Sequence, residues 1–378
     1  MEHDKYYCYI CDNELTEENQ SDEHIILNAI GGHLHSHIVL CKKCNSELGE
    51  KADSKLAEDL SFYTDMLQVK KNRQNHHNQI MKDKDGHEIV VKDTGKHLEL
   101  LKPCIKMENA GKDIHVNIIA RNTKELSGLL RKLVKEGTLS QEDADKISSK
   151  AKIKEHKSVL IKHNVISEEA FPSIIKSAVN YYMDSYHDLN TIKHLIPYIK
   201  GEKDAREVLF LHLFKDLPYT TNSKEVTHMI HLEGHKESKL LYAMMEYFSI
   251  YIYVVVLDSN YHGNEINKTY AYDVVEGKEI ERNFSLRLTL KDLSDFRNLP
   301  HEEYLKYLPY VKNRADEVLK IWERRNDADA INSIINEVFG KYSDGTKITK
   351  KMINEVSEKV SQYIIEKVEN NIFSKIKE

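Results

Sequence analysis

The stretch Cys8-Tyr9-Ile10-Cys11, with Cys41-Lys42-Lys43-Cys44 following after twenty-nine intervening residues, determines how the start of this chain can fold. Four thiolates in two Cys-x-x-Cys pairs form the ligand set of a closed tetrahedral zinc site. A structural zinc contributes on the order of 10 kcal/mol to folding, so a segment too small for a full core can still hold a fixed shape. We therefore predict a structural zinc ion bound by Cys8, Cys11, Cys41 and Cys44.

Between the two pairs lies Ser21-Asp22-Glu23-His24-Ile25-Ile26-Leu27-Asn28-Ala29-Ile30-Gly31-Gly32, and Asn45 follows the second pair directly. We expect a short apolar segment, a turn at the two glycines and a strand over residues 37–40. A helix is predicted from about Asn45, because apolar or small residues recur there at spacings of four. These residues are Leu48, Ala52, Leu56 and Leu60.

This arrangement resembles the HNH endonuclease superfamily, in the branch whose motif runs Cys-x-x-Cys, acidic-His-Ile-x-Pro, Gly-Gly and Cys-x-x-Cys-Asn. The resemblance covers about residues 8–60. It implies a ββα-metal module, in which a hairpin and a helix hold one catalytic divalent ion, Mg²⁺ or Mn²⁺. The activity that it implies is hydrolysis of DNA phosphodiester bonds.

The resemblance also assigns roles to three residues. His24 matches the general base that deprotonates water, Glu23 the acidic metal ligand before it, and Asn45 the metal ligand on the helix. An imidazole titrates near neutral pH and can accept a proton from water. A hard cation held by carboxylate and amide oxygens can neutralise the charge that builds up on a phosphate.

The chain departs from the family pattern at several positions. Leu27 stands where the family has proline, and the orienting asparagine of the motif would fall at Ser36 or His37, neither of which is asparagine. Glu23 replaces the commoner aspartate, so it either binds the metal ion or orients His24. Asn45 has an alternative role as a helix cap.

Four other side chains near the motif have open roles. The alternating His33, His35 and His37 either contact metal or phosphate or form a solvated strand edge, which is the more common case. We expect Asp53 to be a surface charge rather than a ligand.

A chain of 378 residues suggests two to three domains. We expect an α+β fold with an HNH nuclease module and basic extension over 1–82, a mixed α/β accessory region with antiparallel strands over 83–300, and a helical region over 301–378. Residues 123–135 and 140–152 read as a helical hairpin, and residues 167–200 as two helices. Strands are predicted at 208–211, 226–232, 250–257 and 268–274, while 240–248 reads as either strand or helix.

The net charge limits how the chain can contact nucleic acid, and the use of its cysteines indicates the cellular compartment. The net charge is −6, so contact with nucleic acid requires a local basic patch. The best candidate consists of Lys70, Lys71, Arg73 and Lys82, although a solvated basic loop is an equally good interpretation. Because four of five cysteines pair in metal-binding spacing and no secretion signal or bilayer-spanning run is visible, we expect a cytoplasmic protein.

The function predicted from these patterns is a metal-dependent HNH endonuclease that nicks or cleaves DNA, with RNA left open as a substrate. By analogy with nucleases joined to large accessory regions, restriction or anti-phage defence is the expected setting. The alternative is a non-catalytic zinc-dependent nucleic-acid-binding or adaptor protein. An amphipathic stripe over residues 352–372 either packs on its own domain or contacts a second copy or a defence-system partner.

Overall fold

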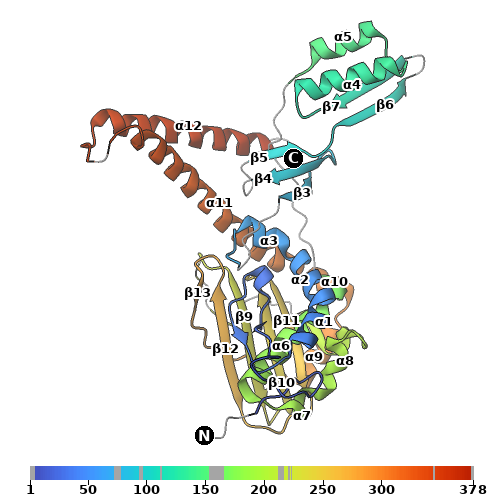
Figure 1. Ribbon diagram of the computed structural model, residues 1–378, viewed down its shortest axis with the longest axis vertical. Coiled ribbons are helices and arrows are strands. Elements are labelled where there is room, and N and C mark those ends of the chain that lie inside the picture. Colours follow the sequence, from blue (N-terminus) through green and yellow to red (C-terminus); the bar gives the residue numbers. More distant parts are fainter. Residues whose placement is uncertain are drawn as a thin grey trace. The chain divides into compact units, whose positions relative to one another are not determined.

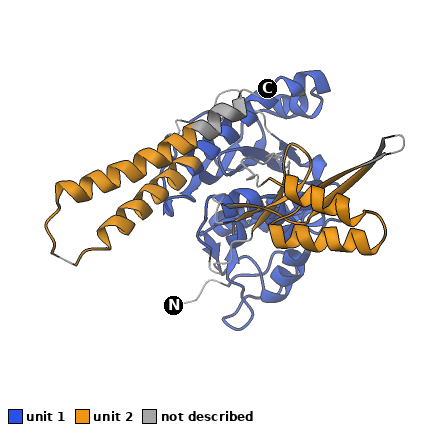
Figure 2. Cartoon of the chain, turned by 90° about the horizontal axis from the view of Figure 1, so that it is seen from above, with its two compact units in different colours: residues 1–76, 163–322 blue, residues 77–162, 323–378 orange. Residues whose placement is uncertain are grey.

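A computed structural model describes most of the chain. The described residues are 5–71, 78–92, 97–110, 113–152, 166–211, 217–219, 222, 224–343 and 345–375. They form two compact units, each built from two separate stretches of chain: Met1–His76 with His163–Trp322, and His77–Lys162 with Glu323–Glu378 (Figure 2). The division into three regions by role, at residues 82 and 300, stays a prediction.

A six-stranded antiparallel sheet forms the centre of the first unit, in the order β13-β12-β9-β10-β11-β8 (Figure 1). Its strands are β8 Leu209–Leu211, β9 Thr227–His235, β10 Leu240–Tyr247, β11 Tyr251–Asp258, β12 Ile266–Asp273 and β13 Lys278–Glu279. Strands β9 and β10 are buried along nearly their whole length, because both faces of the sheet are covered. Such strands read as continuous apolar runs, which is why residues 240–248 did not distinguish strand from helix.

One face of this sheet packs against helix α6, Phe171–Tyr186, and shares a single hydrophobic core with it and with the N-terminal segment. The opposite face is covered by the segment that follows β13, through side chains such as Phe284, Leu286 and Leu288. Helix α6 is buried from Ser173 to Met183, including four polar side chains. A helix buried on all sides must pair its polar groups internally. Three of these groups, Ser173, Lys176 and Asn180, have their partners in the N-terminal segment.

The N-terminal segment is a chain of short elements. They are β1 Glu23–His24, the 3₁₀ turn η1 Asn28–Ile30, β2 His35–Ser36, α1 Lys42–Leu48, the π-helical turn η2 Gly49–Asp53, α2 Ser54–Asp59 and α3 Ser61–Met66. Buried His228 of β9 links this segment to the sheet, with its Nε2 2.8 Å from the carbonyl oxygen of Ile30. The remaining short helices of the unit are η4 Glu168–Ala170, α7 Leu189–Ile192, η5 Lys193–Leu195, α8 Ile196–Ile199, η6 Ala205–Glu207, α9 Leu290–Arg297 and α10 His301–Leu305.

The described residues of the second unit form two small sheets and four helical segments. Its elements are β3 Gln79–Lys82, β4 Glu88–Lys92, β5 His97–Leu100, β6 Cys104–Ala110, β7 Asp113–Ile119, α4 Thr123–Lys135, α5 Gln141–Lys150, the later part of α11 Leu308–Phe339, and α12 Lys350–Lys375. Asn122 and Ser140 cap α4 and α5, as their residue types predict. Ion pairs such as Lys359–Glu337 join α12 to α11, while Ile364 and Val368 remain about half exposed.

The α+β class, the antiparallel strands and the helical C-terminus are confirmed. The strand predicted over residues 37–40 is wrong, since the strand lies two residues earlier at His35–Ser36. Val39 and Leu40 are buried, but their carbonyl oxygens accept hydrogen bonds from Tyr9 and Ser21 rather than from a neighbouring strand of a ladder. None of the helices in the described part of the chain combines the length and hydropathy that a membrane span requires.

Candidate active site

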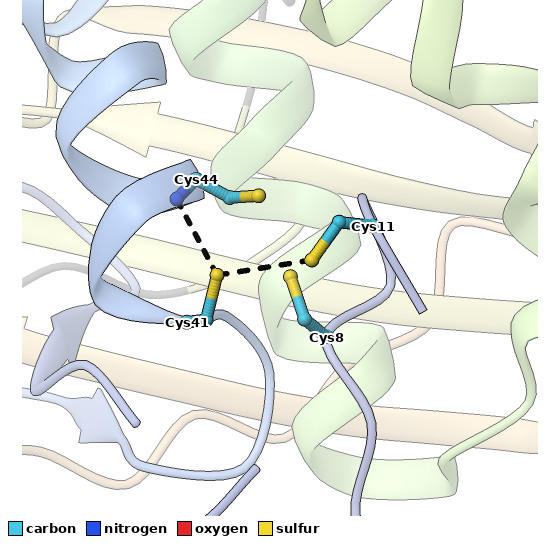
Figure 3. A group of neighbouring side chains, drawn as sticks. All are labelled: Cys8, Cys11, Cys41 and Cys44. Carbon is cyan, nitrogen blue, oxygen red and sulfur yellow. Dashed lines mark hydrogen bonds between the residues drawn. The ribbon is translucent and has the colours of Figure 1, made fainter. Parts of the chain in front are cut away.

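Four cysteine sulfurs converge where the first loop meets the start of α1 (Figure 3). All lie within 4.8 Å of one another, and the sulfurs of Cys11 and Cys41 are 3.8 Å apart. Tetrahedral Zn–S bonds of about 2.3 Å place sulfurs about 3.8 Å apart, so the cluster fits a structural zinc ion. Burial raises the pKa of Cys8 and of Cys44, and a bound cation would lower both by stabilising the thiolate form.

Beside this cluster, β1 and β2 pair as a minimal hairpin, with Glu23 opposite Ser36 and His24 opposite His35. The Gly31-Gly32 turn between them requires glycine at both positions. Gly31 has a φ of +94°, and a Cβ on Gly32 would lie 1.9 Å from the carbonyl oxygen of Ile26. The strand alternation turns Glu23 toward the protein interior and His24 toward the opposite face.

His24 is half-buried and stacks on His35, with ring centroids 5.5 Å apart. Burial lowers the pKa of His24 below its ordinary value of 6.5, and Asp22 offsets only part of this effect. The imidazole is therefore held in its neutral form near pH 7, as a proton acceptor must be.

Glu23 is 3% exposed and its carboxylate contacts helix α6. Its Oε1 accepts hydrogen bonds from Lys176 Nζ at 2.8 Å and from Asn180 Nδ2 at 2.9 Å. Asn180 in turn accepts a hydrogen bond from the hydroxyl of Tyr9 at 2.7 Å. A buried carboxylate with such partners keeps a fixed orientation.

Asp53 is bound by the same face of α6. Its Oδ2 accepts from Lys176 Nζ at 2.6 Å and its Oδ1 from Ser173 Oγ at 2.5 Å. The expectation that Asp53 is a surface charge is therefore wrong, because its side chain is 14% exposed and engaged on both oxygens. Burial lowers the pKa of Lys176, but Glu23 and Asp53 outweigh it and leave that pKa raised.

The α6 residues that reach this site were missed in the sequence. Ser173, Lys176 and Asn180 are spaced three and four apart, which places them on one helix face. The available signal was a set of polar residues inside an otherwise apolar helix, since such groups stay buried only when they are paired. Nothing in the sequence named their partners.

One cavity of about 310 Å³ joins the residues of the motif. Side chains from the hairpin, from α1, from η2 and from α6 line it. Among them are Asp22, Glu23, His24, Asn45, Asp53 and Lys176. The three residues to which the sequence assigned catalysis thus line one space, although Asn45 is separated from the hairpin along the chain.

The positions that depart from the family pattern have other contacts. Ser36 is buried and its Oγ accepts a hydrogen bond from the backbone of Ile38. His37 lies on the exposed face, with Nδ1 3.3 Å from the carbonyl oxygen of Ser21. Leu27 is buried and lines the cavity. An orienting role for Ser36 or His37 stays a prediction.

The basic residues predicted to bind nucleic acid fall into different parts of the chain. Lys70 and Lys71 belong to the first unit, and Lys71 forms an ion pair with the buried Asp65 at 3.3 Å. Lys82 is exposed and belongs to the second unit, while Arg73 lies outside the described residues. The role of this patch stays a prediction.

The site therefore combines a four-cysteine cluster, a two-strand hairpin and a helix, with a histidine and a carboxylate at adjacent positions of the hairpin. Residues 8–61 match the family model described as HNH endonuclease, and this segment belongs to the HNH endonuclease superfamily.

A second family model, described as Caspase recruitment domain, matches residues 109–191. That stretch includes β7, crosses from one compact unit into the other and ends within the short helices after α6. It does not form one domain in this structure. No curated protein and no solved structure matches the chain.

Proposed function

We propose that this protein is a metal-dependent endonuclease that hydrolyses phosphodiester bonds in DNA. The observation that carries the proposal is the shared cavity, which His24 from the hairpin, Asn45 from α1 and Glu23 all line. Nucleic acid is the partner that this class of module implies.

His24 is the proposed general base. Its Nδ1 or Nε2 accepts the proton of a water molecule that attacks the phosphorus, and its lowered pKa leaves the ring neutral before the reaction. The zinc-bound cysteines hold the hairpin and α1 together, which keeps base and metal ligands in fixed relation.

Glu23 and Asn45 are the proposed ligands of the catalytic Mg²⁺ or Mn²⁺. Both hydrogen bonds to Glu23 reach Oε1, which leaves Oε2 as the oxygen for a metal ion. The cavity is lined by three carboxylates, those of Asp22, Glu23 and Asp53, against the single ammonium of Lys176, and this excess of negative charge favours a cation there. Once bound, such an ion neutralises charge on the phosphate and the leaving oxygen.

Cleavage of supercoiled plasmid in the presence of Mg²⁺ or Mn²⁺ tests the proposal. We expect His24→Ala to reduce the rate about 10²–10⁴-fold, the usual contribution of a general base. His194→Ala, an exposed histidine on η5 of the same unit, is the matched control and should cleave at the wild-type rate.

The alternative, a zinc-dependent binding or adaptor module, predicts that wild type and His24→Ala behave alike in this assay while both retain nucleic-acid binding. Equal rates for the two would therefore refute the nuclease. Matched DNA and RNA duplexes and single strands extend the assay, and faster cleavage of RNA would overturn the DNA assignment.

The biological setting follows by analogy alone. We propose a cytoplasmic role in restriction or anti-phage defence, with the accessory residues selecting the substrate or the trigger. The half-exposed apolar side chains of α12 are the proposed contact for a second copy or a partner protein.

A further inference from the structure

Three metal-binding side chains gather on the outer face of the β1–β2 hairpin. They are Asp22, His35 and His37, and one donor atom from each lies within 4.8 Å of the others. His35 Nδ1 is 2.6 Å and His37 Nε2 is 3.6 Å from the same oxygen, Asp22 Oδ1. This cluster is separate from the four cysteines and from the proposed Glu23 and Asn45 ligands.

The strand register explains the grouping. Glu23 pairs with Ser36, and both side chains are buried. Because successive side chains alternate between faces, the positions on either side of this pair lie on the opposite, exposed face. Asp22 precedes Glu23 and His37 follows Ser36, so a single hairpin places its metal-binding side chains together.

The hydrogen bond of His37 fixes which nitrogen is available. Its Nδ1 lies 3.3 Å from the carbonyl oxygen of Ser21, which can only accept, so Nδ1 carries the proton. In the neutral ring Nε2 then carries a lone pair, and this lone pair faces the carboxylate of Asp22. This arrangement leaves the Nε2 lone pair of His37 and the carboxylate of Asp22 open to a cation. A backbone carbonyl bound to the remote nitrogen is also how proteins orient metal-binding histidines.

We propose that Asp22, His35 and His37 form a second metal site, which binds a divalent transition-metal ion. Two imidazoles and one carboxylate favour Zn²⁺, Mn²⁺ or Co²⁺ over Mg²⁺, which prefers oxygen ligands only. Tetrahedral bonds of about 2.0–2.1 Å need donors about 3.4 Å apart, and the three donor atoms lie within 4.8 Å of one another, so the exposed side chains would have to move closer together to bind the ion. All three side chains are about half exposed, which leaves a coordination position open to water or to a phosphate oxygen.

The place of this site suggests its use. His24 stacks on His35, and Asp22 lines the cavity that contains His24, Glu23 and Asn45. An ion held here lies beside the proposed base and can accept an oxygen of the scissile phosphate or of its neighbour. This use rests on the proposed nuclease function, whereas binding of the ion does not.

Calorimetric titration of Zn²⁺ into the full chain, with its four-cysteine site already filled and Mg²⁺ absent, tests the site. We expect one further equivalent to bind to the wild type, and the double variant His35→Ala/His37→Ala to lose this equivalent. Asn45→Ala should keep it, because Asn45 belongs to the other proposed site. His33→Ala should also keep it, since His33 lies on the same hairpin but packs against Tyr272.

Several outcomes would overturn the proposal. They are no further equivalent in the wild type, an unchanged equivalent in the double variant, or its loss in His33→Ala or Asn45→Ala. Cobalt–thiolate absorption of each variant shows whether the four-cysteine site is intact, so a misfolded hairpin is recognised. If the double variant disturbs the hairpin, His35→Ala alone, which keeps the oriented His37, takes its place. This single variant should bind the further zinc ion with an affinity at least about tenfold lower than that of the wild type.

Plasmid cleavage by the wild type distinguishes failure of this site from failure of the nuclease. Cleavage without a further zinc equivalent refutes the second metal site alone. A further equivalent without cleavage refutes the proposed function and leaves the metal site standing.

Discussion

A single histidine and its burial determine the pH range in which the proposed reaction can run. The pKa of His24 is lowered from its ordinary value of 6.5 because burial disfavours the imidazolium form. A base must be neutral to accept a proton, so activity is present above the lowered pKa and is lost as pH falls through it. We expect the acidic limb of the plasmid-cleavage rate to have its midpoint below pH 6.5.

The measurement is the rate of plasmid cleavage at saturating Mn²⁺ as a function of pH. The range runs from pH 5 to pH 8 because it brackets the ordinary histidine pKa of about 6.5. Circular dichroism over the same range serves as the control for unfolding and loss of zinc. A midpoint above 6.5 with the fold intact would show that His24 is not the group that titrates.

Lys176 is a buried cation shared by two carboxylates of the N-terminal segment. Lys176→Met would leave Glu23 and Asp53 without their ammonium partner, and removal of one member of a buried pair typically costs about 3–5 kcal/mol. We expect a loss of this size in the free energy of unfolding when Mg²⁺ is absent. Addition of Mg²⁺ should recover part of the loss, because the ion supplies the missing positive charge.

Denaturant unfolding with and without Mg²⁺ measures both effects. Lys43→Met, at an exposed lysine on α1, is the matched control and should cost less than about 1 kcal/mol. If Lys176→Met is as stable as Lys43→Met, the buried ion pair contributes nothing.

At the scale of elements, the four-cysteine cluster joins the first loop to the start of α1. Cys41 both contributes a sulfur to the cluster and caps α1, since its sulfur accepts a hydrogen bond from the backbone of Cys44. We expect Cys41→Ser to abolish cobalt–thiolate absorption and plasmid cleavage together. Cys104→Ser, in β6 of the second unit, should change neither.

The prediction is contradicted if a variant loses cobalt–thiolate absorption but keeps plasmid cleavage, or the reverse. In particular, full cleavage by Cys41→Ser would mean that the core alone holds the hairpin and α1 in place.

Most elements were predictable because their signals are local. The capped hairpin of α4 and α5, the terminal helices and four strands of the large sheet, β8, β9, β11 and β12, follow from capping residues and apolar periodicity. The four cysteines and the adjacent Glu23-His24 pair were likewise visible as spacing.

The polar face of α6 could not be predicted in the same way. Ser173 binds Asp53 across 120 positions of the chain, and Asn180 binds Glu23 across 157. Pairing over such distances depends on the tertiary fold, which local patterns do not encode. The same limit explains the error at Asp53. Its neighbours in the sequence predict an exposed side chain, but its partners Ser173 and Lys176 lie on a helix that follows more than a hundred residues later.

At the scale of the whole molecule, the N-terminal segment that matches the HNH family and the six-stranded sheet share one core. Tyr63 of α3 packs against Phe248, with ring centroids 5.6 Å apart, and the buried set of the N-terminal segment is continuous with α6 and the sheet. A fragment of residues 5–71 would expose this surface. We therefore expect this fragment to be largely unfolded, apart from the two loops that carry the four cysteines, and unable to cleave plasmid.

Expression of this fragment, with its circular dichroism and cleavage rate compared with those of the full chain, checks the prediction. An active, cooperatively folded fragment would show that α6 is dispensable for the site.

The loops that hold the four cysteines leave the ribosome more than a hundred residues before helix α6. During synthesis the N-terminal segment therefore lacks the lysine and asparagine that hold its buried glutamate, as well as the sheet beneath its hairpin. The proposed cutting centre is complete only once residues far downstream have emerged and folded. The order of the chain thus delays assembly of this site until synthesis has passed α6 and the sheet.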